Sequence, residues 1–177
     1  MNAEKKYIFG SKKSKWALYR FHLDGYMKRW IFKTPFERVP FIKTYIPLKN
    51  IRLHHILRSD LDTALHDHPF SFWTILLTGG YLEVLPLYDL ENLNYDIHNQ
   101  VKYLKRDHDH VKYIKRFCGS VRWVAAETAH RLILEKPVWT LVFAEEAQGR
   151  WGFYRGGFSR SNWIDHEKYL GINEEVE

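Results

Sequence analysis

Short apolar runs separated by turn residues dominate the chain from residue 51 onward. These runs are rich in β-branched and aromatic residues and show little of the spacing of an amphipathic helix, so they predict β-strands. They fall at 51–58, 65–77, 81–87, 101–106, 111–117, 121–126, 131–134, 139–143 and 150–154. Many short strands with no helices between them predict an all-β sandwich, jelly roll or closed barrel.

Two connections between these strands can be placed. Gly79 and Gly80 separate two apolar runs and predict a turn between paired strands. The pieces VKYLKR (101–106) and VKYIKR (111–116) nearly repeat, with the polar residues Asp107 to His110 between them. We expect these two pieces to form a β-hairpin.

The first fifty residues mix lysine, arginine and aromatic residues without a clean period. Pro35, Pro40 and Pro47 keep part of this region extended, because the residue before a proline avoids the helical conformation. Segment 15–22 fits a short helix or a strand equally well. We expect 1–50 to be an N-terminal extension that packs on a barrel formed by 51–155.

The end of the chain predicts a short helix. Ser161 or Asn162 can cap a helix that runs to Leu170, and Gly171 is placed to end it. We expect 156–177 to be a C-terminal extension of the same single domain.

Composition narrows the class of protein. The chain has 177 residues, of which 45% are hydrophobic and 16% aromatic, which suits one domain with its own core and favours strands. Its one cysteine, Cys118, excludes an intramolecular disulfide bond. No apolar run is long enough for a membrane span or a secretory signal, so we expect a cytoplasmic protein without a membrane partner, as a monomer or homodimer.

A His-x-His pair carries the clearest chemistry. His66 and His68 lie two residues apart in a predicted strand, so their side chains share a face. With a third histidine, His130, on a neighbouring strand they would form a three-nitrogen metal site. Asp67 points to the opposite face, where we expect a turn contact or a surface ion pair, with a hydrogen bond to the site as the alternative.

Other residues are candidates for the wall of a pocket beside this site. His54 and Arg58 lie on the strand before it, and Trp73 and Tyr81 follow it. Arginines at 52, 58 and 122 are candidates for binding a carboxylate or phosphate, because the planar guanidinium matches such groups.

The net charge of +6 allows an anionic partner, although solubility explains it as well. The hairpin Lys102–Arg116 places lysine and arginine beside Tyr103 and Tyr113, a mixture that can bind single-stranded nucleic acid. A solvated edge hairpin, protected by lysine from pairing with another sheet, is the alternative that we prefer.

The segment LHDHPFSFWTILLTGGY (65–81) resembles the first motif of the cupin superfamily. That motif has a His-x-His pair, a glutamate three or four residues further on, and then a glycine. His66, His68 and Gly80 match the motif, whereas its glutamate position falls on Phe72 or Trp73, which cannot bind a metal.

The segment GSVRWVAAETAHRLIL (119–134) resembles the second cupin motif, a glycine followed by a Pro-x-Gly turn and a histidine. Gly119 and His130 match, whereas residues 125–127 read Ala-Ala-Glu in place of the turn. The piece TLVFAEEAQGRWGFY also resembles the end of a small cupin subgroup of bacteria and phages.

The resemblance, which covers 51–154, implies a cupin-type double-stranded β-helix, a jelly-roll barrel. It implies that His66, His68 and His130 hold a divalent metal ion inside the barrel. Fe(II) is the expected metal, and Zn, Ni or Mn are alternatives because imidazole suits all of them.

A set of three histidines without a carboxylate is similar to that of the thiol dioxygenases. The leading interpretation is therefore an iron-dependent oxygenase that acts on a small polar or anionic molecule. The alternatives are an isomerase or epimerase of a sugar or sugar nucleotide, with or without metal, and a non-catalytic protein that binds carbohydrate or nucleic acid.

Overall fold

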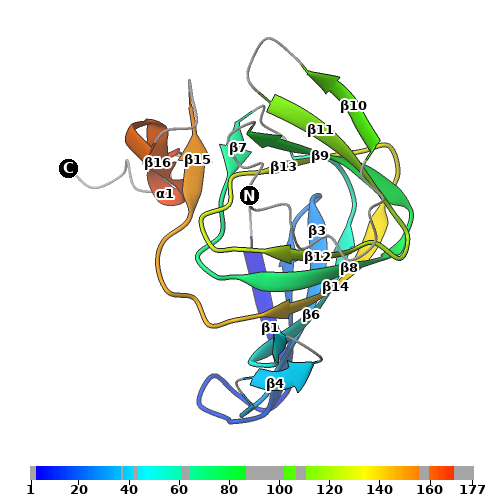
Figure 1. Cartoon of the computed structure of the whole chain (residues 1–177). Helices are drawn as coiled ribbons and strands as arrows, with labels where there is room; N and C mark the ends of the chain where they lie inside the picture. Colours follow the sequence, from blue (N-terminus) through cyan, green and yellow to red (C-terminus); the bar gives the residue numbers. More distant parts are fainter. Residues whose placement is uncertain are drawn as a thin grey trace, which may run out of the picture.

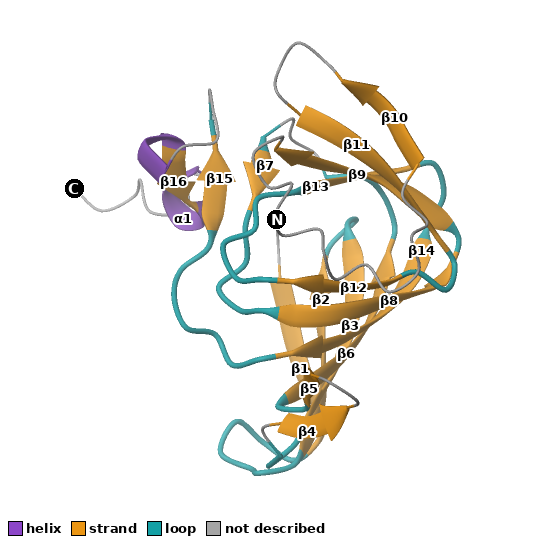
Figure 2. Ribbon diagram, viewed as in Figure 1, coloured by secondary structure: helices purple, strands orange, loops and turns teal. Residues whose placement is uncertain are grey.

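Antiparallel β-strands make up almost all of the regular structure (Figure 2). The computed structural model describes residues 3–36, 38–41, 44–60, 64–86, 102–106, 111–155 and 160–169. The all-β fold class expected from the sequence is confirmed. No helix within these ranges has the length and apolar character needed to cross a membrane.

The largest sheet has seven strands. In spatial order they are β1 (Ala3–Phe9), β2 (Ala17–Leu23), β3 (Met27–Lys33), β6 (Asn50–Ile56), β14 (Val138–Ala144), β8 (Phe72–Thr78) and β12 (Val121–Val124). Segment 15–22, which fits a helix or a strand by sequence, belongs to strand β2. Strands β2 and β3 form a hairpin that extends the barrel sheet next to β6.

Three smaller sheets complete the structure. One contains β10 (Lys102–Arg106), β11 (Val111–Phe117), β9 (Gly80–Pro86) and β13 (Arg131–Leu134), and another contains β16 (Trp163–Asp165), β15 (Gly152–Tyr154) and β7 (Leu65–His66). The strands β4 (Arg38–Phe41) and β5 (Thr44–Pro47) pair with each other.

The order of the central strands is that of a jelly roll. Strands β6, β8, β12 and β14 lie in the large sheet, whereas β9, β11 and β13 lie in the sheet that faces it across the interior (Figure 1). A bridge between His66 and His130 adds β7 beside the start of β13. Eight strands that pass between two facing sheets in this order form the double Greek key of a jelly roll.

The connections predicted from glycine and from the near-repeat are confirmed. Gly79 lies between β8 and β9 with a φ of 75°. Strands β10 and β11 pair antiparallel, with Lys102 opposite Lys115. In β11, Lys112 and Arg116 are 1% and 2% exposed, so their side chains are not part of a basic outer surface. The side chains of 102–106 and the residues 107–110 lie outside the described part of the chain.

The single strand predicted over 65–77 is wrong. Strand β7 ends at His66 and β8 begins at Phe72. Proline has no N–H group for a sheet ladder, and Pro69 lies in the gap between the two strands. The backbone there bonds to the segment after β14 instead: Asp67 N donates to Gly152 O at 3.1 Å and Gln148 N donates to Pro69 O at 2.7 Å.

The surface ion pair or turn contact expected for Asp67 is also wrong. Its carboxylate is fully buried and accepts three hydrogen bonds from the C-terminal segment. The donors are Gly152 N at 2.7 Å, Tyr154 OH at 3.2 Å and Trp163 Nε1 at 2.9 Å. Asp67 therefore fastens β15 and β16 to β7.

The predicted C-terminal helix is shorter and begins later than expected. Residues Arg160–Asn162 form a 3₁₀ turn, strand β16 follows, and helix α1 spans only His166–Tyr169. Asp165 Oδ1 accepts a hydrogen bond from Glu167 N at 2.9 Å at the start of this helix. A competing strand pairing with β15 thus occupies the residues that looked like a helix start.

Candidate functional site

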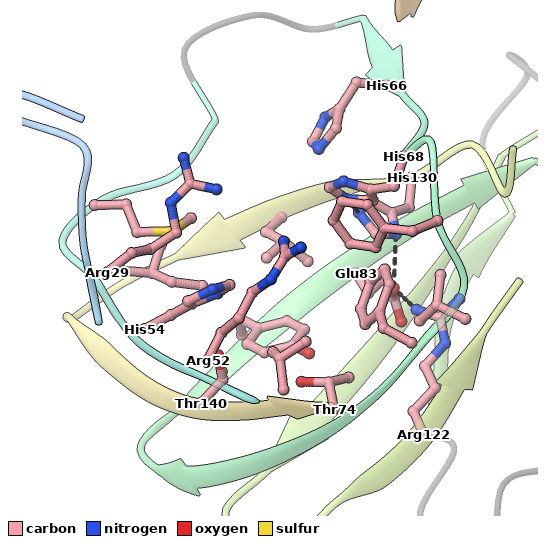
Figure 3. Close-up of a pocket in the computed structure, with 18 of the residues that line it drawn as sticks. Arg29, Arg52, His54, His66, His68, Thr74, Glu83, Arg122, His130 and Thr140 are labelled. Carbon is pink, nitrogen blue, oxygen red and sulfur yellow. Dashed lines mark hydrogen bonds and ion pairs between the residues drawn. The ribbon is translucent and has the colours of Figure 1, made fainter. Parts of the chain in front are cut away.

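Three histidines from separate positions in the fold meet inside the barrel. His66 ends β7, His68 lies in the turn that follows, and His130 directly precedes β13. Each offers a ring nitrogen, and these nitrogens all lie within 4.8 Å of one another. The backbones of His66 and His130 are joined by two hydrogen bonds of 2.9 and 2.8 Å, which fix the two strands side by side. Figure 3 shows the three rings gathered at one end of the pocket.

The geometry of this cluster fits a metal ion. Two nitrogens that bind one ion at about 2.1 Å and at right angles lie about 3 Å apart. The Nε2 atoms of His68 and His130 are 3.1 Å apart. The described residues therefore bring together the three histidines that were proposed as ligands from the sequence.

Burial keeps these imidazoles neutral. It is the largest cause that lowers the pKa of His68 and His130 well below 6.5, and the neighbouring histidines and Arg122 add to it. Burial also lowers the pKa of His66, although Asp60 and Asp67 oppose the shift. A neutral imidazole has a free lone pair, which metal binding requires.

Glu83 on β9 lies beside one of the three rings. Its carboxylate is 1% exposed and forms ion pairs with Arg122 and, at 3.0 Å, with Arg116. Oε1 of Glu83 lies 3.6 Å from His130 Nδ1 (Figure 3). A carboxylate in this place favours the proton on Nδ1 and leaves Nε2 free to face the other histidines.

Asp60 approaches the site from the other side. It accepts hydrogen bonds from Leu132 N, at 2.7 Å, and from the hydroxyl of Tyr26. Its Oδ2 atom lies 3.9 Å from His66 Nδ1. Burial and then the charge of Asp60 raise the pKa of Tyr26 well above 10, so Tyr26 keeps its proton and donates it in this hydrogen bond.

The three histidines open onto a cavity of about 100 Å³ between the two sheets. This cavity is comparable to one of roughly 150 Å³ that admits benzene, so it suits a molecule of a few heavy atoms. Its lining combines apolar strand residues with two threonines, Thr74 and Thr140, and several charged side chains, among them Glu83 and Arg122.

The pocket candidates from the sequence divide into two groups. His54 and Tyr81 line the cavity. Trp73 lies between the lining residues Phe72 and Thr74 and so faces the opposite side of β8, where its ring is 5.5 Å from that of Trp123. Arg58 does not line the cavity; its Nε donates to Gly25 O at 2.9 Å.

Arg29 on β3 lines the cavity and was not a candidate from the sequence. The N-terminal region shows no clean period, so the sequence does not reveal that β3 joins the barrel sheet. The register places Arg29 directly opposite His54 of β6. Tyr26 likewise comes from this N-terminal hairpin and lines the same cavity.

The chain matches no protein-family model and no curated protein. Among solved structures it is similar to an oxalate decarboxylase variant from Bacillus subtilis, with 14% identity and a TM-score of 0.45 over 87% of this chain and 32% of that one. It is also similar to vicilin from Corylus avellana (hazelnut), with 10% identity and a TM-score of 0.44 over 85% and 37% of the two chains. It is also similar to an Fe(II)-HppE structure with an alternative substrate, with 8% identity and a TM-score of 0.36 over 81% of this chain and 56% of that one.

The chain thus spans about a third of the length of the first two proteins and just over half of the third. With TM-scores below 0.5, these likenesses assign neither a family nor an activity to the chain.

Proposed function

We propose that this chain is a cupin-like, metal-dependent enzyme that binds one divalent ion through His66, His68 and His130. The observation that carries the proposal is the convergence of three neutral imidazoles at one end of a cavity inside a jelly roll. Fe(II) is the metal that we expect, and Zn, Ni or Mn are alternatives.

The reaction that we propose is the oxygenation of a small polar or anionic molecule. A bound ion would supply a Lewis acid with coordination positions that three protein ligands leave open. The protein's own part would be to hold the rings and to limit the access of bulk water: Glu83 lies beside His130 Nδ1, and the two sheets would enclose the substrate. No side-chain nucleophile is needed.

An isomerase or epimerase is the second candidate, and a specific pair of residues favours it. Tyr26 lines the cavity and its hydroxyl donates a hydrogen bond to Asp60. Such a pair could relay a proton, because the hydroxyl oxygen can take one from a substrate carbon next to a carbonyl group as its own proton passes to Asp60. This reaction would consume no oxygen.

To separate these candidates, the protein is first loaded with Fe(II) under anaerobic conditions. Oxygen is then admitted and its uptake is measured. We expect uptake that depends on a small polar or anionic substrate in wild-type protein and in His55→Ala, and none in His68→Ala. His55 is a matched control because it lies on the same sheet but stacks on Trp139, at 4.3 Å between ring centroids, rather than lining the cavity. Substrate turnover without oxygen uptake would favour the isomerase, and binding without turnover would favour the non-catalytic alternative.

A further inference from the structure

Two arginines of the cavity have no acidic partner. Arg29 of β3 and Arg52 of β6 both line it, and no carboxylate pairs with either guanidinium in the part of the chain that the structure describes. The Nε atom of each is shielded from solvent and makes no hydrogen bond. The Nε2 atom of His54, directly opposite Arg29 in the sheet register, is in the same condition.

This arrangement is costly for the protein alone. A buried polar group without a partner costs free energy, and a buried charge without a partner costs more. Burial, and then the positive charge of Arg29, lower the pKa of Arg52 to about 10. The same barrel pairs its more deeply buried arginines, since Arg116 and Arg122 both contact Glu83, whereas Arg29 and Arg52 are partly buried. The absence of an acidic partner for Arg29 and Arg52 among the described residues therefore indicates that a bound ligand supplies the negative charge.

The two guanidinium groups are also held in position. The guanidinium carbon of Arg52 lies 4.1 Å from the centroid of the Phe70 ring, and that of Arg29 lies 4.8 Å from the Phe21 ring. Figure 3 shows both guanidinium groups directed into the space that the three histidines also face. Burial, and then the charges of Arg29 and Arg52, keep the pKa of His54 well below 6.5, so His54 is a neutral ring that can donate through Nε2.

We propose that Arg29, Arg52 and His54 form an oxyanion subsite that binds the carboxylate, phosphate or phosphonate group of a small acid. The planar guanidinium fork fits all of these groups, and charge-assisted hydrogen bonds to them are strong. The acid's other end faces His66, His68 and His130. That this acid is the substrate rests on the proposed function, whereas binding of an oxyanion does not require the metal.

The cavity size restricts the class of ligand further. At about 100 Å³, it takes an acid of a few heavy atoms, such as a short dicarboxylate or a hydroxylated phosphonate, rather than a nucleotide or a fatty acid. The ligand has two polar ends, because the cavity has guanidinium groups on one side and imidazoles on the other.

Isothermal titration of metal-free protein with inorganic phosphate and with malonate tests the subsite directly. We expect wild-type protein to bind at least one of them and its uncharged analogue malonamide not at all. Arg29→Met and Arg52→Met should each weaken binding by about tenfold or more, and the double variant should abolish it. Arg150→Met removes the same charge from an exposed side chain that pairs with Asp165, and should bind like wild type.

Thermal unfolding separates a binding role from a structural one. Without added anion, Arg29→Met and Arg52→Met should melt at the wild-type temperature or higher, because each removes a partly buried charge that has no acidic partner among the described residues. Phosphate or malonate should raise the melting temperature of wild type but not that of the double variant. Variants that unfold, wild-type protein that binds neither anion, or a double variant that binds as well as wild type would each overturn the proposal.

The His68→Ala variant distinguishes this proposal from the metal assignment. It should lose metal yet retain phosphate or malonate binding in the metal-free state. If it retains metal while the arginine variants lose the anion, the ligand assignment fails and the subsite stands.

Discussion

Glu83 joins two roles in one buried carboxylate. It balances Arg116 and Arg122 and lies beside the Nδ1 atom of His130. Removal of one partner from a buried ion pair leaves an uncompensated charge, and loss of a carboxylate beside a metal-binding histidine weakens the metal site. One side chain therefore connects the stability of the barrel to the proposed metal site.

We predict that Glu83→Gln lowers the free energy of unfolding by about 3 kcal/mol and metal affinity by about tenfold. Chemical denaturation and competition with a chelator measure the two effects. The control is Glu146→Gln, because Glu146 is exposed and pairs with Lys49 at 3.8 Å. Unchanged stability and metal affinity in Glu83→Gln would show that the buried carboxylate has neither role.

His54 predicts a pH dependence of stability. Its pKa in the folded protein lies well below 6.5, first because of burial and then because of Arg29 and Arg52. Below about pH 6.5 the unfolded chain binds a proton that the folded state refuses, so stability falls as pH falls. One such group contributes a slope of up to about 1.4 kcal/mol per pH unit.

Denaturation of metal-free protein between pH 5 and pH 7 should therefore show a shallower slope for His54→Gln than for wild type, by about one proton. His55→Ala is the control, since His55 lies on the opposite face of β6. Equal slopes in wild type and His54→Gln would mean that His54 does not resist protonation.

Sequence reasoning at the residue scale found the three histidines but not Arg29. The histidines lie in recognisable local patterns around residues 66 and 130. Arg29 faces the cavity only because β3 pairs with β6 in one particular register, and a shift by one residue would turn it outward. Nothing in the local sequence fixes that register.

At the scale of elements, the break between β7 and β8 explains how His66 and His68 converge. The sequence placed both in one strand, where alternation alone would put them on one face. In the structure, His68 lies in a turn, and backbone hydrogen bonds at Asp67, His68 and Pro69 hold this turn in place. The sequence therefore predicted correctly that His66 and His68 lie together, but the single strand on which that prediction rested does not form.

Asp67→Ala should loosen the C-terminal strands and disturb the metal site together. It removes a carboxylate that accepts hydrogen bonds from Gly152 N, Tyr154 OH and Trp163 Nε1, and a hydrogen bond to a charged group contributes about 1.5–3 kcal/mol. We expect a loss of about 3 kcal/mol or more in unfolding free energy and faster limited proteolysis after β14.

Asp24→Ala is the matched control, because Asp24 is exposed in the turn between β2 and β3. The unfolding free energy and the proteolysis rate of Asp67→Asn should lie between those of wild type and Asp67→Ala, since an amide oxygen can still accept a hydrogen bond from Gly152 N. If proteolysis of Asp67→Ala matches that of the wild type, the C-terminal strands are held by other contacts.

The strand runs were predictable because each is short, apolar and bounded by turn residues. The late start of helix α1 was not, because pairing of Trp163–Asp165 with β15 depends on a partner strand that local sequence does not identify. The pairing of β16 with β15 is therefore favoured over the helix that Ser161 or Asn162 could have capped.

At the scale of the whole molecule, the jelly roll has an apolar core built without the three histidines. The described residues form three clusters of buried apolar side chains, which include Leu76 with Val138, Leu65 with Val84, and Phe72 with Val142. The topology was predictable as a class, since many short strands without helices admit few folds, whereas the extension of the sheet by β1, β2 and β3 was not.

We predict that metal-free protein stays folded. Far-UV circular dichroism should be unchanged after chelation, while the melting temperature falls, because an ion that binds only the folded state adds to its stability. Loss of the β-sheet signal on chelation would mean that the metal organises the fold, as in a zinc finger.

The metal content per chain tests the central claim most directly. Wild type and four variants, His66→Ala, His68→Ala, His130→Ala and His55→Ala, would be loaded with Fe(II), desalted and measured by elemental analysis. Convergence of His66, His68 and His130 on one ion predicts close to one metal per chain in wild type and His55→Ala, and close to none in the other three. Equal metal content in all five proteins, or none in wild type, would contradict it.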